Sequence, residues 1–181
     1  TVGGTAEEMT KIRSELRDLA KELPFSHQKL NRMAEAVGRF GVAAPNIAEV
    51  TEMFAKLGVA IPEMDPTAAA ENMVRFFNVM GTGVDNWEKN LSAVVDLGNN
   101  LPTSEQQIIE FSSRLAQISA VAPVTEADVL GLGAAFAALN IRPMAGASSI
   151  SRVFFEMDEA VKGSTENMDT FTRIMDITDE K

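Results

Sequence analysis

The feature that most constrains this chain is a helical spacing of apolar residues that continues along almost its whole length. In each of nine stretches, apolar side chains recur three or four residues apart, which places them on one face of an α-helix. No stretch alternates apolar and polar residues over the length of a strand, and Tyr is absent. The spacing predicts an all-α fold of about eight or nine short helices. The stretches begin at Ile12, Leu30, Val50, Met73, Trp87, Ile108, Val129, Ile150 and Met168.

The residues between these stretches support the same division. A proline inside a helix costs about 3 kcal/mol or more, so prolines mark helix boundaries. All seven lie between stretches: Pro24, Pro45, Pro62, Pro66, Pro102, Pro123 and Pro143. N-caps are expected at Ser26, Thr67, Thr103 or Ser104, and Thr125. C′ residues with positive φ are expected at Gly41, Gly58, Gly81, Gly98 and Gly163.

The chain also resembles itself at an offset of 99 residues. Helical spacing alone would align apolar positions by chance, but here Pro24 and the cap Ser26 also align with Pro123 and Thr125. This agreement predicts a duplicated three-helix stretch. The matched ranges are 16–42 with 115–141 and, after one added residue, 50–57 with 150–157.

A weaker third copy is expected in the middle of the chain. There Gly98 and Pro102 are spaced like Gly41 and Pro45, and an apolar helical stretch follows each pair. Each helix pair would have one apolar face that needs a neighbour to cover it. Stacked pairs therefore predict either a compact bundle or a short α-solenoid.

Two parts of the chain are expected to behave differently. Residues 1–162 are predicted to form the helical-repeat domain. Residues 163–181 are poorer in apolar side chains, and we expect a loosely docked helix or a linker. Because residue 1 is Thr and no signal-peptide pattern precedes the first helix, we interpret the chain as a segment of a longer protein.

The charge balance argues against several classes of partner. The chain carries 26 acidic and 16 basic residues, a formal net charge of −10. No run of Lys or Arg forms the basic face that attracts nucleic acids or anionic membranes. No Cys is present, which removes disulfides and thiol chemistry. The missing basic face leads us to expect no direct nucleic-acid binding. No apolar run reaches the roughly 18–20 residues of a membrane helix, so we also expect no membrane segment.

Few residues suggest chemistry, and each has a structural interpretation that we favour. His27, the single histidine, has no second histidine with which to hold a metal, so we expect a surface or capping role. Gly131 and Gly133 lack the preceding strand of a dinucleotide loop, which favours close helix packing. The small residues 145–149 favour tight packing or N-capping over anion binding, and their serines have no base nearby in sequence.

The remaining candidates are also expected to be structural. Arg114 and Arg152 are predicted on solvated faces, with bridges between neighbouring repeats as the alternative. Trp87 is expected in the core, with anchoring of a partner as the alternative. The ten Met residues suggest adaptable core packing rather than a partner groove. We therefore expect no enzyme activity and no catalytic, cofactor or metal site.

Several stretches carry a family resemblance through their order and spacing. They are 16–24 with 30–42, 47–54 with 65–78, 97–105 with 113–116, and 145–148 with 151–161. Over about residues 15–162 the chain resembles the tape measure proteins, minor tail proteins of phages and prophages, near their N-terminal half. No single motif is diagnostic. Ala147 departs from the Ala-Gly-Thr or Gly-Gly-Thr pattern that we expect of the family.

The resemblance implies a structural role. Tape measure proteins lie inside the tail tube, help to set tail length during assembly and leave the tube when DNA is delivered. The resemblance thus implies tube, tail-tip and assembly-chaperone partners, with self-association as a further option. It also implies a place in the virion tail after assembly in the bacterial host cytoplasm. Two other classes stay open: an α-solenoid that binds a peptide or helix, and a muralytic enzyme, which would need paired Glu in a defined cleft.

Overall fold

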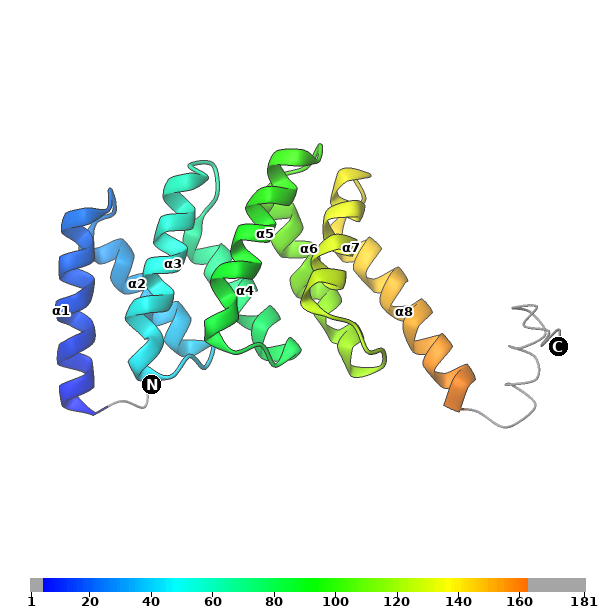
Figure 1. The fold of residues 1–181 in the computed structure, drawn as a ribbon, viewed down its shortest axis with the longest axis horizontal. Coiled ribbons are helices and arrows are strands. Elements are labelled where there is room, and N and C mark those ends of the chain that lie inside the picture. Colours follow the sequence, from blue (N-terminus) through cyan, green and yellow to red (C-terminus); the bar gives the residue numbers. More distant parts are fainter. Residues whose placement is uncertain (1–4, 163–181) are drawn as a thin grey trace.

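The computed structural model describes residues 5–162, which are helical almost throughout (Figure 1). The described α-helices are α1 (Ala6–Glu22), α2 (His27–Arg39), α3 (Ile47–Ala60), α4 (Pro66–Met80), α5 (Trp87–Asn100), α6 (Glu105–Leu115), α7 (Glu126–Ala138) and α8 (Pro143–Lys162). Short 3-10 helices precede α3 and α5 and follow α6: η1 (Ala44–Asn46), η2 (Val84–Asn86) and η3 (Ala116–Ala120). The all-α prediction is confirmed. The first eight apolar stretches each lie in one α-helix, and the ninth, from Met168, lies outside the described residues.

The helices follow one another in chain order along the long axis, from α1 at one end to α8 at the other (Figure 1). They form two layers. In one layer α2, α4, α6 and α8 pack side by side, and in the other α1 contacts α3 and α5 contacts α7. Extensive contacts thus join helices that are one or two places apart in the chain, so each helix is covered by its sequence neighbours.

Two kinds of connection join the helices. The first is an apolar residue, a proline and an N-cap, as in Leu23-Pro24-Phe25-Ser26 before α2. The second is a Schellman turn, in which a residue with positive φ lets the next amide reach back to a carbonyl in the last helical turn. The positive-φ residues are Gly41 after α2 (φ 97°), Gly81 after α4 (φ 72°) and Asn140 after α7 (φ 54°). The returning bonds are Val42 N to Val37 O (3.4 Å), Thr82 N to Phe77 O (2.9 Å) and Ile141 N to Phe136 O (3.2 Å).

These connections alternate along the chain until α6, which has the proline type on both sides. Pro102 precedes α6, and Pro123 follows η3 before α7. The 99-residue offset therefore pairs α1, α2 and α3 with α6, α7 and α8, each of which lies in the opposite layer. Within the layers the recurrence is instead α2–η1–α3 with α4–η2–α5, where Gly41 and Gly81 are 40 residues apart (81 − 41). The duplication itself stays a prediction.

Two glycines that we expected at helix ends lie inside helices. Gly58 is in α3 and Gly98 is in α5, and neither has positive φ. Both permit close packing instead: a Cβ on Gly58 would lie 2.8 Å from Pro66, and one on Gly98 would overlap Glu105. Because Gly98 is not a counterpart of the turn residue Gly41, the third copy built on that comparison is wrong.

Most of the predicted N-caps are confirmed, and one is wrong. The confirmed caps each accept a hydrogen bond from the backbone amide three residues later: Ser26, Ser104 and Thr125. Thr67 is not the cap of α4, because Asp65 occupies that position and accepts a hydrogen bond from the Thr67 amide. Pro66 then stands at the first helical position, where its fixed φ suits the helix. Gly163, expected as a C′ residue, lies outside the described residues.

Helices α6 and α7 approach each other closely. Gly133 of α7 faces Ser112 of α6, and a Cβ on Gly133 would lie 3.2 Å from the Ser112 amide nitrogen and overlap its hydroxyl. Ser112 is fully buried, and its hydroxyl has no hydrogen-bond partner among the described residues. Gly131 lies two residues earlier, on a different face of the same helix, and has open space where a Cβ would stand. The expected close helix packing is therefore confirmed at Gly133 and wrong at Gly131.

Thr82 connects the two halves of the array. Its carbonyl accepts a hydrogen bond from the Trp87 indole (3.0 Å), and its hydroxyl donates one to the Glu126 carboxylate at the start of α7 (2.6 Å). The pKa of the Glu126 carboxyl is lowered from its ordinary value of 4.5, mainly by the hydrogen bond from this hydroxyl and next by that from the Glu126 amide. Trp87 is 2% exposed and stacks on Phe77 with ring centroids 4.6 Å apart, which confirms its expected place in the core.

The two glycines of α7 give a matched pair of substitutions. We expect Gly133→Ala to lower the free energy of unfolding by about 1–3 kcal/mol, because α6 and α7 must move apart. Gly131→Ala makes the same chemical change in open space, so helix propensity should raise stability by up to about 1 kcal/mol. Chemical denaturation followed by circular dichroism measures both. Equal effects of the two substitutions would contradict the packing described for Gly133.

The bond between Thr82 and Glu126 predicts a pH-dependent contribution to stability. A carboxyl whose pKa is lowered on folding stabilises the fold above its ordinary pKa of 4.5, and the contribution is lost as pH falls through the folded-state pKa. Glu126→Gln should therefore destabilise the protein at pH 7 and converge toward the wild type in acid. Trp87 fluorescence during urea unfolding reports this difference at each pH.

Glu88 provides the control for that experiment. It lies in the first turn of α5, and its side chain accepts no hydrogen bond from another described residue. Glu88→Gln should show a smaller pH-dependent difference from the wild type. A Glu126→Gln effect that is the same at pH 3 and pH 7 would contradict the assigned role of the bond.

Candidate functional site

A groove of about 890 Å³ lies at the α1 end of the array, between α1, α2 and the start of α4. We call it the α1–α2 groove. Its floor is apolar and formed by side chains that also belong to the core. These floor residues are Ile12, Leu16, Ala34, Ala36 and Ile47. Such a floor suits an apolar surface on a ligand or partner.

Arginine side chains line the edge of this groove. Arg13 and Arg17 are one turn apart on α1, and Arg32 faces them from α2. All three residues are exposed, and none forms an ion pair within residues 5–162. The groove is lined by four Arg, including Arg39, and by two Glu, so it has a positive excess in a chain whose net charge is −10.

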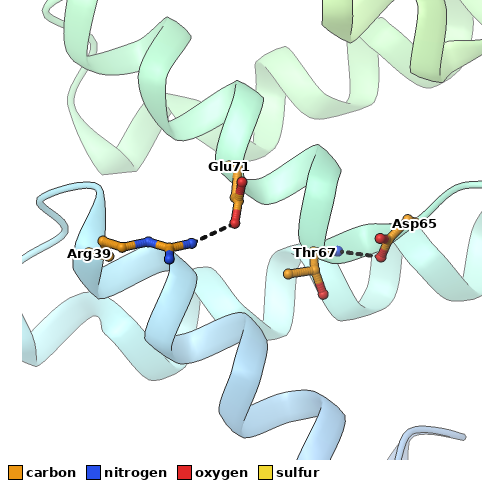
Figure 2. A network of polar contacts seen from close by, with 4 residues as sticks. All are labelled: Arg39, Asp65, Thr67 and Glu71. Carbon is orange, nitrogen blue, oxygen red and sulfur yellow. Dashed lines mark hydrogen bonds and ion pairs between the residues drawn. The ribbon is translucent and has the colours of Figure 1, made fainter.

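Arg39 differs from the other arginines because it is paired. Its guanidinium lies 2.7 Å from a carboxylate oxygen of Glu71, which ties α2 to α4 across the groove wall (Figure 2). The Asp65 carboxylate accepts the Thr67 amide hydrogen bond (3.0 Å) and so holds the first turn of α4, and Glu71 projects from the next turn. The Arg39 side chain is 66% exposed, so this ion pair positions the wall more than it stabilises the fold.

His27 is the one titratable ring that lines the groove. It is the first residue of α2 and half-buried, and its Nδ1 lies 3.1 Å from the Asn31 amide nitrogen. With that nitrogen as the donor, Nδ1 accepts and the neutral ring carries its proton on Nε2. Nε2 is buried and has no hydrogen-bond partner in the described part of the chain. The cap of α2 is Ser26, so the expected capping role of His27 is wrong.

Two smaller grooves have different chemistry. One, of about 390 Å³ between α3 and α5, is lined by Glu49, Glu52 and Glu88 with Lys56. Glu52 accepts a hydrogen bond from Lys56 and raises the pKa of that ammonium group, so the lysine charge is already neutralised locally. The other, of about 560 Å³, runs between α4, α6 and α8 and is lined by Arg75, Arg114 and several uncharged polar side chains. The α1–α2 groove differs from both in its three arginines without an ion pair in residues 5–162, Arg13, Arg17 and Arg32.

The other sequence candidates take structural roles. Arg114 pairs with Glu110 (3.2 Å) and Arg152 with Glu156 (2.7 Å), each within its own helix, so neither bridges two helices. In the small-residue segment 145–149, a Cβ on Gly146 would lie 2.9 Å from the Phe111 ring, which confirms tight packing there.

The structure brings together arginines that sequence reasoning did not select. Arg13 and Arg17 are separated by one helical turn, and like charges at that spacing do not stabilise an isolated helix. That pair is a signal in the sequence. The contribution of Arg32 was not visible, because it depends on how α2 packs against α1.

Two further properties of the described residues bear on function. Within residues 5–162, no three His, Asp or Glu side chains gather closely enough to hold a metal ion. No described helix combines the length and the apolar character needed to cross a bilayer.

Comparison with known proteins places the chain in a family. The sequence profile of the phage-related minor tail proteins matches residues 13–181. None of the curated proteins and none of the solved structures matches the chain. The profile match covers nearly all of the helical array, from within α1 to beyond α8, and it agrees with the resemblance carried by the sequence stretches. This chain therefore belongs to the family of phage-related minor tail proteins.

Proposed function

We propose that this minor tail protein chain is part of a tape measure protein and takes part in setting tail length. Its family membership makes it a structural component of the phage tail. The order and spacing of the stretches that resemble tape measure proteins support the finer assignment. Its partners would then be the tube, the tail tip and assembly chaperones, which it would meet in the host cytoplasm before the virion is complete.

The architecture supports a structural role in an assembly. The array is elongated, and α1 and α8 lie at its opposite ends (Figure 1). Contacts between close sequence neighbours allow such an array to be extended by further helices without a change in the existing ones. α8 retains exposed apolar side chains on its outer surface, including Val153 and Met157 at 47% each, which another helix could cover.

A second candidate function is a module that binds a helix or peptide, without a role in length determination. The α1–α2 groove favours it, because the groove combines an apolar floor with an arginine edge. We also propose that the chain is not an enzyme. Two glutamates line the α1–α2 groove, and one of them, Glu71, is paired with Arg39, so a single carboxylate is left there where glycoside hydrolysis needs two.

Tail length in the intact phage tests the tape measure proposal. We would insert about 40 residues of helical heptad sequence directly after Lys181, where the described array is left unchanged. A helical ruler rises about 1.5 Å per residue, so tails should lengthen by about 60 Å in electron micrographs. The control is a phage with silent codon changes around Lys181 and no insertion. Assembled tails of unchanged length would contradict length determination and leave the helix-binding module as the better reading.

A further inference from the structure

The α1–α2 groove has charges that are not satisfied within the array. Arg13, Arg17 and Arg32 line it and form no ion pair with another described residue. Carboxylates on a bound segment would pair with these guanidinium groups. The charge of the groove edge is therefore complementary to an acidic occupant.

The floor and size of the groove add a second requirement. The floor is apolar, so the occupant should be amphipathic, with one apolar face and acidic flanks. A helix about 10 Å across has a cross-section of about 80 Å². A volume of about 890 Å³ therefore receives about 11 Å of helix, which is about two turns.

The segment 163–181 of this chain meets both requirements in its sequence. It contains five acidic residues and two basic ones, a net charge of −3 (2 − 5). Met168, Phe171 and Met175 recur at helical spacing and span two turns. We infer that the α1–α2 groove of one copy binds the segment 163–181 of a second copy, which joins two molecules end to end. This inference goes beyond the tail role and does not depend on length determination.

The arrangement of the array explains why the segment would come from a second copy. Segment 163–181 follows α8, whereas the groove is formed by α1 and α2 at the opposite end (Figure 1). Four helices packed 8–10 Å apart in one layer occupy about 30 Å. As a helix, the segment is about 29 Å long, so it would be used up before it could fill the groove of its own copy.

Sedimentation velocity of the full chain tests the inference. We expect the average mass to rise with protein concentration from about 10 to 500 µM in low salt. Association should weaken strongly in about 0.5 M NaCl, since charges at the groove edge are screened. Arg13→Glu with Arg17→Glu should weaken association at least about tenfold. Far-UV circular dichroism would establish that each variant is folded.

The chain offers a matched control and a rescue. Lys11→Glu with Lys21→Glu makes the same charge change on the same helix, at residues that do not line the groove, and should leave most of the association intact. Asp169→Arg with Asp176→Arg reverses the charge of the segment and should also abolish association alone. Mixing this variant with Arg13→Glu/Arg17→Glu should restore it, because the unchanged segment of one variant meets the unchanged groove of the other, and the reversed segment meets the reversed groove.

Several results would overturn the inference. A mass that stays monomeric at every concentration in low salt would exclude binding to a second copy. The same result is expected if the segment occupies the groove of its own copy, and it would overturn the inference equally. Equal loss in the Lys11/Lys21 control would show general charge repulsion instead. Failure of the mixed variants to associate would show that the groove and the segment do not meet.

Discussion

Each helix of this array has an apolar face that it cannot bury alone, and the neighbouring helices in the chain provide the cover. Leu16 of α1 and Phe111 of α6 are both buried, yet α1 has no extensive contact with α6. The core is therefore assembled from local pairings. The last described helix shows the consequence, because α8 has fewer neighbours and keeps exposed apolar side chains. These include Met144, Val153, Phe155, Met157 and Val161.

The local nature of this packing explains how much could be predicted from sequence. Helix positions depend on spacing, prolines and caps within a few residues, so the stretches beginning at Ile12 and Val129 were located well. Gly58 and Gly98 were misplaced because a glycine near a helix end can serve either a turn or a close contact. Which role it takes depends on the partner, here Pro66 or Glu105. Thr67 has a different, local explanation, since Asp65 is a preferred N-cap residue and Pro66 suits the first helical position.

The groove was beyond sequence reasoning for the same reason. Arg13 and Arg17 could be placed on one face of a helix, but their relation to Arg32 depends on the packing of α1 on α2. A net charge of −10 also predicts no basic surface. The overall charge is an average, and three arginines without an ion pair in residues 5–162 line one groove at the α1 end. For a tail component, an end with distinct charge is suited to ordered assembly, because complementary charge fixes orientation and partner choice.

Native-state hydrogen exchange after one destabilising substitution tests the central claim, that this is an array held by neighbour contacts. Leu16→Ala in α1 removes a side chain that is 2% exposed and should cost about 2–5 kcal/mol locally. The account predicts faster exchange in α1, α2 and α3, which pack together, and unchanged exchange in α6 and α7. An equal loss of protection in all described helices would contradict it.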